Sequence, residues 1–391
     1  MKICDVVQSF TARSGGIRTY ILARQRYFAD HDCCEHVLVV PGARDSARQE
    51  GRTRIHEVAS PFIPGYRPYR FNVRAGRVAR ILAAEMPDVI ELANPFLLSG
   101  VAFRHRKRHA ACAVVGFYHA DFPTAYVAEP VASVWGRRAG RACGGLAEAY
   151  ARRVYGRYDL TIAASPANIR RLGAMRIGNV AEIPLGVDLG AFDPARADPG
   201  ALRDLFRPAA GSGPVLIYCG RLDREKQVEV LVRAHQSLPR AAGIRLLMIG
   251  EGPLRPAMEA QAAMEPRLVV LPFVTDRIRL ATLLASSDLY VTAGPFETFG
   301  LSVLEAQACG LTVVGVDAGA LPDRVPPGQG RLVPAGDACA MAAAIVSELA
   351  RDRDERRRTA RAWAEANGDW ARILDMMLVT YSQLRPARRQ A

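Results

Sequence analysis

Two carboxylates, Glu297 and Glu305, lie eight positions apart where a glycine-bearing turn leads into an apolar segment of helical character. Helical spacing places Glu305 within that helix and leaves Glu297 on the preceding turn. The free backbone amides and the positive end of the helix dipole attract an anion to such a turn. Amides that bind phosphate and carboxylates that bind hydroxyl groups together predict a site for a nucleotide sugar. Taken alone, Glu305 is also explained as an acidic residue near a helix start.

Two cations and a second tight turn fit the same ligand. The predicted strand 215–219 ends in a turn that begins at Gly220. Arg221 and Lys226 on this turn offer one guanidinium and one ammonium group to a common diphosphate. Gly250 opens a further turn, of the kind that a strand-to-helix crossover needs when a ligand approaches its backbone. The alternative for both cations is an ordinary solvated position.

In the first half of the chain, a histidine and a pair of glycines follow predicted strands. His119 comes after the apolar strand 113–118, where a single histidine is either a hydrogen-bonded structural residue or part of a site. Gly15 and Gly16 follow the first strand, at residues 1–7. They form either a simple tight turn or a place where a backbone amide approaches phosphate.

Apolar runs alternate with longer amphipathic stretches along the chain, a rhythm typical of parallel sheets covered by helices. The runs are residues 36–40, 89–92, 113–118 and 160–163, and then 215–219, 245–249, 268–272, 289–292 and 312–316. The Pro/Gly-rich interval 183–190 between the two groups predicts a hinge between two doubly wound α/β domains. Ligands of such sheets bind beyond the carboxyl ends of the strands, so we expect a cleft with a donor wall and an acceptor wall.

The C-terminal region predicts two further helices. Residues 348–361 are dense in both charge signs and indicate an exposed helix, and residues 369–384 have the apolar periodicity of an amphipathic helix. With the hinge, they give the expected domains: 1–186, 187–366 and a terminal helix within 367–391.

Composition limits the class of protein and its compartment. The 391 residues suffice for two hydrophobic cores, and no apolar stretch reaches the roughly 18 residues of a membrane span. Asp5 interrupts the first apolar run, which argues against a signal peptide. The eight cysteines lack paired spacing, which suits a reducing compartment. We expect a cytoplasmic protein, either free or peripheral at the inner face of the cytoplasmic membrane.

The net charge of +13 permits binding of any polyanion but names none, and only Lys2, Lys107 and Lys226 are lysines among 52 basic residues. Many of the arginines lie in the first half, at Arg70, Arg74, Arg77, Arg80, Arg104, Arg106, Arg108, Arg137, Arg138, Arg141, Arg152, Arg153 and Arg157. These form either solvated faces or the contact to an anionic membrane surface. We expect no nucleic-acid partner.

Three further patterns are expected to carry no site. Arg255 stands where a dinucleotide-binding turn starting at Gly250 would need its third glycine. The acidic pair Asp352 and Asp354 lies in a charged helical run rather than after a strand. Residues 31–36 hold His, Asp and Cys side chains too close in sequence to share one tetrahedral ion. No metal site is expected.

Six motifs, in this order along nearly the whole chain, carry a resemblance to a known family. They are Ser14-Gly15-Gly16-Ile17-Arg18, His119-Ala120-Asp121-Phe122-Pro123, Ile183-Pro184-Leu185-Gly186-Val187-Asp188, the segment from Gly220 to Lys226, the segment from Gly250 to Leu254, and the segment around Glu297 and Glu305. The chain resembles the retaining GT-B glycosyltransferases of family 4, and within them the bacterial GDP-mannose-dependent enzymes that mannosylate a phosphatidylinositol mannoside or a related lipid.

The resemblance implies a role for each site residue. It assigns the reaction centre to His119, Arg221, Lys226 and Glu297. It assigns donor contacts to Gly15, Gly16, Gly220, Gly250, Val274, Phe299, Gly300, Leu301 and Glu305, with Glu305 on the ribose hydroxyls. It assigns acceptor contacts to Arg18 and Asp121. It also implies that the last helix returns to the first, acceptor-binding domain, and that the second domain binds the nucleotide sugar.

The expected reaction is transfer of a hexose with retained configuration, with mannose from GDP-mannose favoured, to a hydroxyl of a lipid-linked or other glycan. The nucleotide sugar is a co-substrate, and no cofactor or metal is expected. The alternatives are a UDP-sugar donor, a nucleotide-sugar epimerase, or a non-catalytic module that binds a nucleotide sugar.

Overall fold

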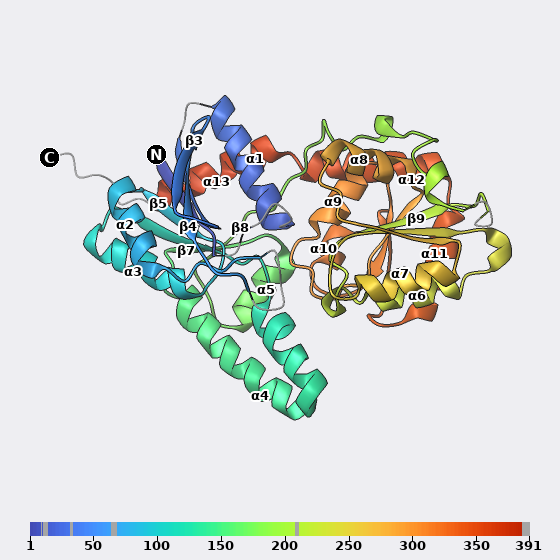
Figure 1. Ribbon diagram of the computed structural model, residues 1–391, viewed down its shortest axis with the longest axis horizontal. Coiled ribbons are helices and arrows are strands. Elements are labelled where there is room, and N and C mark those ends of the chain that lie inside the picture. Colours follow the sequence, from blue (N-terminus) through green and yellow to red (C-terminus); the bar gives the residue numbers. More distant parts are fainter. Residues whose placement is uncertain (9, 11–14, 32–33, 64–68, 208–210, 385–391) are drawn as a thin grey trace. The chain divides into compact units, whose positions relative to one another are not determined.

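The computed structural model of the chain describes residues 1–8, 10, 15–31, 34–63, 69–207 and 211–384 (Figure 1). The chain forms two compact units. The first comprises Met1–Pro184 and the segment that starts at Ala371, and the second comprises Leu185–Trp370. The divisions expected from the sequence fall after residues 186 and 366.

The first unit is built on a largely parallel sheet of eight strands within the described residues. The strands are β1 (Lys2–Val6), β2 (Glu35–Gly42), β3 (Ser46–Glu50), β4 (Thr53–Ala59), β5 (Val89–Leu92), β6 (Ala113–Phe117), β7 (Leu160–Ala163) and β8 (Val180–Glu182). Their order is β3-β4-β2-β1-β5-β6-β7-β8, and β3 pairs with β4 antiparallel at the edge.

The helices of the first unit cover both faces of this sheet. They are α1 (Gly16–Asp30), α2 (Ala75–Glu85), α3 (Leu97–Arg108), the π-helical turn η1 (Pro123–Ala128), α4 (Glu129–Tyr155), α5 (Pro166–Ala174) and α13 (Trp370–Leu384). Successive strand residues point to opposite faces. Cys4 and Ile90 therefore join the core formed with α2 and α3, whereas the intervening Asp5 and Glu91 point to the face that holds α1 and α13.

The face under α13 contains a buried ionic cluster. Arg24 of α1 is fully buried, with its Nη1 2.8 Å from Asp5 Oδ1 and 2.6 Å from Glu91 Oε2. The hydroxyl of Tyr381 on α13 donates to Glu91, and the hydroxyl of Tyr20 donates to the same carboxylate at 3.1 Å. Burial raises the pKa of Glu91, and Arg24 opposes that rise. The last helix is thus bonded into the interior of the first unit.

The second unit is a wholly parallel sheet of six strands among the residues described. The strands are β9 (Val215–Cys219), β10 (Arg245–Ile249), β11 (Leu268–Leu271), β12 (Leu289–Val291), β13 (Val313–Val316) and β14 (Gly330–Val333), in the order β11-β10-β9-β12-β13-β14. The order reverses between β9 and β12. Because ligands of such sheets bind at the point of reversal, the turns that follow β9 and β12 form the expected ligand site.

The main helices of the second unit are α6 (Val228–Gln236), α7 (Arg255–Met264), α8 (Arg277–Ser286), α9 (Leu301–Ala308), α10 (Leu321–Arg324), α11 (Ala338–Leu349) and α12 (Arg353–Asn367). Short 3₁₀ turns are η2 (Pro194–Arg196), η3 (Arg203–Leu205), η5 (Arg224–Lys226) and η6 (Arg240–Ala242). The alternating βα units agree with the predicted fold class of two doubly wound parallel-sheet domains.

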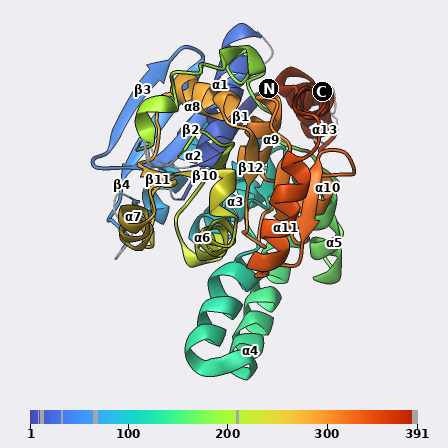
Figure 2. The ribbon, with the colours of Figure 1, turned by 90° about the vertical axis from the view of Figure 1, so that its right-hand side faces the viewer.

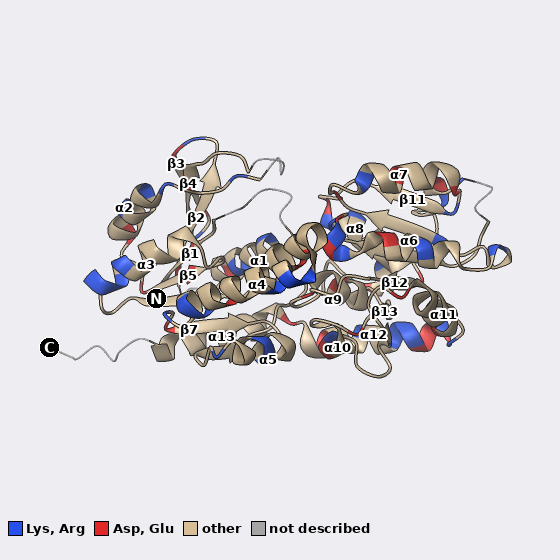
Figure 3. Cartoon of the chain, turned by 90° about the horizontal axis from the view of Figure 1, so that it is seen from below, with Lys and Arg blue, Asp and Glu red and all other residues tan. Residues whose placement is uncertain are grey.

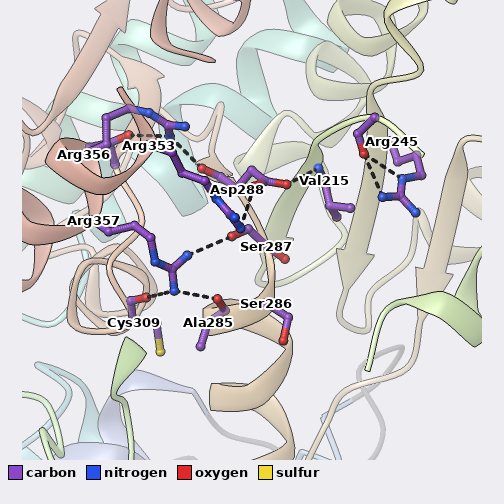
Figure 4. Close-up of polar contacts among 12 residues, drawn as sticks. Val215, Arg245, Ala285, Ser286, Ser287, Asp288, Cys309, Arg353, Arg356 and Arg357 are labelled. Atoms are coloured by element: carbon purple, nitrogen blue, oxygen red, sulfur yellow. Dashed lines mark hydrogen bonds and ion pairs between the residues drawn. The ribbon is translucent and has the colours of Figure 1, made fainter. Parts of the chain in front are cut away.

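The prediction of one exposed helix over residues 348–361 is wrong. α11 ends at Leu349, and Asp352 caps a new helix by accepting from the Glu355 amide at 2.7 Å. Arg356 is buried and donates to the Asp288 carbonyl at 2.8 Å, so one face of α12 docks on the start of β12 (Figure 4). Some of the charged residues in this segment therefore serve packing, because its arginines donate hydrogen bonds to carbonyl groups at the end of α8 and before β12.

The described residues contain no helix that combines the length and the apolar character needed to cross a lipid bilayer.

Candidate functional site

The turns after β9 and β12 meet through an ion pair. Lys226 Nζ lies 2.5 Å from Glu297 Oε1, and both side chains are largely buried. Burial lowers the pKa of Lys226, but the carboxylates of Glu297 and Glu225 outweigh it and raise the pKa above the ordinary lysine value. A Cβ atom at Gly294 would lie 3.0 Å from the Lys226 side chain, so the glycine leaves room for the lysine stem. The two predicted residues therefore share one charged site at the point of strand reversal.

Arg221, on the same turn as Lys226, is held by acidic neighbours. Its Nη1 lies 2.6 Å from Asp223 Oδ2, and its Nη2 also pairs with Glu225. Asp223 additionally accepts from the Lys226 amide at 3.0 Å, which fixes the turn. The guanidinium is nearly half exposed, with 45% of its side-chain surface accessible. The arginine is thus oriented by carboxylates while keeping an open side.

The start of α9 presents backbone amides without a side-chain cap. Gly300 precedes the helix in the left-handed conformation, with φ of 78°, and as a glycine it offers no side chain to cap this end. Glycine adopts this conformation without steric cost. Phe299 is buried beneath Arg324, whose guanidinium carbon lies 4.0 Å from the ring centroid. The first amides, beginning at Leu301, remain suited to an anion.

Glu305 is buried one turn further along α9 and has a partner that sequence analysis missed. Arg277 Nη1, from the first turn of α8, lies 2.9 Å from Glu305 Oε1. Burial raises the pKa of Glu305, and Arg277 only partly opposes that rise. The sequence signal for Arg277 was weak, because it consisted only of a cation directly after the helix-capping Asp276.

The turns that contain Gly220 and Gly250 interlock for packing reasons. A Cβ atom at Gly250 would lie 1.8 Å from the Gly220 carbonyl oxygen, and one at Gly252 would lie 2.2 Å from the Leu222 carbonyl oxygen. The Leu222 amide donates to the Glu251 carbonyl at 2.9 Å. Gly250 and Gly252 are therefore required by the fold, and the donor contacts of Gly220 and Gly250 stay predictions.

Val274 is half-buried in the loop between β11 and α8, the loop that also leads to Arg277. Its predicted contact with the base stays a prediction as well.

In the first unit, one residue separates His119 from the end of β6, and its ring is packed among aromatic rings. Its ring stacks on Phe117 with centroids 3.9 Å apart, and Tyr20 approaches edge-on at 5.9 Å. Burial lowers the pKa of His119 to about 3, against a smaller opposing effect of Asp5. The imidazole is therefore neutral near pH 7 and acts as a hydrogen-bonding group rather than a cation.

The two predicted acceptor residues lie on different elements. Asp121 is tied into a cluster, since Arg171 Nε lies 2.9 Å from its Oδ2 and the Tyr118 hydroxyl donates to its Oδ1 at 2.9 Å. Arg18 is half-buried on α1, three residues after Gly15 at the start of that helix. The roles of Arg18 and Asp121 toward an acceptor stay predictions.

The glycines before α1 differ from those of the second unit. A Cβ atom at Gly15 would meet nothing within 4 Å among the described residues, so packing there does not demand glycine. Gly16 is exposed as the first residue of α1. Ser14, from the same motif, lies outside the described residues.

The pattern at residues 31–36 divides into structural roles. His31 stacks on Tyr27, and His36 Nε2 lies 2.8 Å from Asp5 Oδ2 inside the first unit. Residues 32 and 33 lie outside the described part of the chain. Within that part, no group of three or more His, Cys, Asp or Glu side chains is arranged to hold a metal ion.

Solved structures define the class of fold. Sucrose-phosphate synthase from Thermosynechococcus elongatus aligns with a TM-score of 0.79 and 22% identity, over 98% of this chain and 99% of that one. The catalytic domain of starch synthase IV from Arabidopsis thaliana aligns with a TM-score of 0.73 and 13% identity, over 98% and 99%. The architecture is that of the GT-B glycosyltransferases, as the sequence predicted.

Sequence comparisons then give the family. Residues 14–191 match the family model described as Glycosyltransferase Family 4, and residues 213–351 match that of Glycosyl transferases group 1. The GDP-mannose-dependent alpha-(1-6)-phosphatidylinositol dimannoside mannosyltransferase of Mycobacterium tuberculosis is 30% identical over 100% of this chain and 98% of that protein. The GDP-mannose-dependent alpha-mannosyltransferase of Mycolicibacterium smegmatis is 31% identical over 92% and 90%. The chain belongs to glycosyltransferase family 4, and its activity class is hexosyl transfer.

Proposed function

We propose that this enzyme transfers mannose from GDP-mannose, with retained anomeric configuration, to a hydroxyl group of a lipid-linked or other glycan acceptor. The names of the similar mannosyltransferases support the donor and the acceptor class. The observation that carries the proposal is the Lys226–Glu297 pair beside the uncapped start of α9, at the point of strand reversal. This arrangement joins a cation, a carboxylate and free amides, which are the groups that a sugar diphosphate needs.

The second unit, within residues 187–366, would hold the donor. The amides that begin at Leu301 bind the diphosphate, and Lys226 and Arg221 offset the negative charge that grows on the departing nucleotide. Lys226 suits this task because its raised pKa keeps it charged near neutral pH. Glu297 binds hydroxyl groups of the hexose, and Glu305 binds those of the ribose.

The first unit, within residues 1–186 and completed by the helix in 367–391, would bind the acceptor. His119, as a neutral imidazole, hydrogen-bonds to the donor sugar near its reacting carbon. Gly15 and Gly16 let a backbone amide approach the donor phosphate. Arg18 and Asp121 are assigned to the acceptor.

The proposed reaction needs no covalent intermediate on the protein and no metal. The bond between the anomeric carbon and the phosphate oxygen breaks, and the acceptor oxygen forms a new bond on the same face of the sugar. The acceptor proton passes to the departing phosphate oxygen, so atoms and charge balance. The nucleotide sugar is the only co-substrate in this scheme.

A donor panel tests the proposal. Purified protein is incubated with GDP-mannose, UDP-glucose and UDP-N-acetylglucosamine, with and without a phosphatidylinositol mannoside, and the products are separated. We expect a glycosylated lipid from GDP-mannose in preference to the UDP-sugars, and the same yield with a metal chelator. An altered nucleotide sugar without acceptor would indicate an epimerase. Binding without turnover of any donor would indicate a non-catalytic module, and either result overturns the proposal.

A UDP-sugar donor remains the second candidate. The protein Alr3699/HepE from Anabaena, solved in complex with UDP-glucose, aligns with a TM-score of 0.73 at 18% identity. Likeness at that level concerns the fold alone, so the donor panel decides between the two. We place the enzyme in the cytoplasm, peripheral at the inner face of the membrane where a lipid-linked acceptor would lie.

A further inference from the structure

One element of the first unit packs on its core only at its base, through residues such as Ala151 and Tyr155, and its far end has no role in the site described above. We call residues 123–155, which comprise η1 and α4, the hairpin. Its helical path reverses at Gly136, where φ is 83° and ψ is 164°. A Cβ atom at Gly140 would lie 2.6 Å from Ala132 Cβ, and one at Gly144 would lie 2.9 Å from Ala128 Cβ. These glycines let the two arms pack closely, and Figures 1 and 2 show the arms extending away from the sheet of the first unit.

The tip of the hairpin exposes two apolar side chains. All residues from Ser133 to Arg138, which we call the tip, are exposed. Val134 is 71% exposed and Trp135 is 73% exposed. The reversal at Gly136 fixes both side chains at the end of paired helices, where they cannot fold back into a core. Exposing a tryptophan and a valine in this way has no explanation in the packing of the first unit.

The hairpin is also strongly basic. It carries Arg137, Arg138, Arg141, Arg152 and Arg153 against the acidic Glu129 and Glu148. Glu148 is already used inside the first unit, where its Oε1 lies 2.6 Å from Arg171 Nη2. Figure 3 shows the basic segments along α4 in blue. Arginines next to the apolar tip complement a negatively charged surface.

We propose that the tip is a membrane-docking element, with Val134 and Trp135 entering the boundary between head groups and acyl chains of an anionic bilayer. Tryptophan favours this boundary because its ring is apolar and its N–H is polar. Arg137, Arg138 and Arg141 would lie at the level of the lipid phosphates.

The small area of the tip favours a bilayer over a protein partner. A stable protein interface buries about 800 Å² on each side. Two apolar residues followed in sequence by Arg137 and Arg138 offer far less than this, whereas a bilayer can take up both apolar side chains together. The purpose of docking rests on the proposed lipid-linked acceptor, but the tip's chemistry does not depend on any donor or acceptor.

Vesicle flotation of the full-length protein tests the proposal. Vesicles of phosphatidylcholine alone are compared with vesicles in which phosphatidylglycerol replaces part of it. The wild-type protein is expected to float with the anionic vesicles and to do so less at high salt. A basic side chain near an anionic surface contributes about fivefold to partitioning, so Arg137→Gln with Arg138→Gln should weaken it about 25-fold. Val134→Ser with Trp135→Ser should weaken it about tenfold or more.

Two matched controls separate docking at the tip from general effects. Arg279→Gln with Arg358→Gln removes the same charge from exposed positions of the second unit. Leu146→Ser removes a side chain that is 74% exposed on the second arm, away from the tip. Both controls should retain most of the vesicle binding. If either control weakens binding as much as the matching tip variant does, or if the wild-type protein ignores anionic vesicles, tip docking is wrong.

A second readout and an activity assay complete the test. Quenching of tryptophan fluorescence by brominated lipid should occur in the wild-type protein and be lost with Trp135→Ser, although Trp363 and Trp370 remain. Turnover of nucleotide sugar without vesicles should be equal in wild-type and tip variants. Vesicle binding without turnover of any donor would refute the proposed function alone, and turnover without tip-dependent binding would refute this inference alone.

Discussion

The ion pair between Arg277 and Glu305 offers the sharpest test of the proposed donor site. Glu305 is 6% exposed, and burial raises its pKa while Arg277 opposes that rise. Arg277→Met keeps an apolar stem but removes the positive charge. The pKa of Glu305 should then rise further, so that its carboxyl group is protonated over a wider pH range and binds ribose hydroxyls less well.

The size of the effect follows from the geometry. Removing one partner of a fully buried ion pair costs about 3–5 kcal/mol. The side chain of Arg277 is 34% exposed, so solvent screens the pair and we take about 2 kcal/mol. Because donor binding uses the ionised carboxylate of Glu305, favouring its protonated form by this amount weakens donor binding up to about 30-fold, since about 1.4 kcal/mol is a factor of ten. The kcat should change less, since the ribose is remote from the bond that breaks.

The assay measures KM for GDP-mannose against pH in wild-type, Arg277→Met and Arg279→Met proteins. Arg279 is exposed on the same helix and serves as the control. We expect the KM of Arg277→Met to be high near neutral pH and to fall as pH rises through the elevated pKa of Glu305, because deprotonation restores the carboxylate. The reasoning is refuted if the two variants share one KM and one pH profile while melting at the same temperature.

Three further perturbations probe the site, the turns and the last helix. Lys226→Met should lower kcat about 10²–10³-fold by removing a charge that stabilises the leaving diphosphate, and steady-state kinetics with an unchanged kcat would contradict this role. Gly250→Ala should lower the free energy of unfolding by about 1–3 kcal/mol, because its Cβ would lie 1.8 Å from a carbonyl oxygen. Urea unfolding measures that loss, and a neutral result would mean that the interlocked turns can separate. Tyr381→Phe removes a donor from buried Glu91 and should cost about 1–2 kcal/mol by the same method, whereas Val379→Ala, at a position 58% exposed on the same helix, should cost less than the tyrosine variant.

Buried parallel strands were readable from the sequence because both of their faces are covered. β5, β7, β9 and β10 begin and end at the predicted residues, since each is an apolar run bounded by turn residues. The edge strand β3 is mostly exposed and polar, so it has no such run. The charged helix α12 was predicted wrongly because its arginines look solvated in the sequence. In the fold, Arg356 and Arg357 donate hydrogen bonds to backbone carbonyl groups at the end of α8 and before β12.

The sequence indicates a candidate site residue only where that residue stands in a recognisable motif. Lys226, Glu297 and Glu305 stand in motifs with glycines and strand ends, and these motifs carried the prediction. Arg277 comes from another helix, and its only local signal, its position directly after Asp276, does not indicate a pairing with Glu305. The packing role of Gly250 likewise depends on a second turn that only the folded backbone brings near.

The attachment of α13 has a consequence for the order of events at the ribosome. Domains usually fold as their sequence emerges, the N-terminal one first. Here the second unit is one continuous stretch, Leu185–Trp370, whereas the first unit needs residues from Ala371 onward. The cluster of Arg24 and Glu91 therefore stays incomplete until Tyr381 has emerged from the exit tunnel. We expect the second unit to complete its fold before the first, with one ionic cluster of the nascent chain unfinished until α13 has been made.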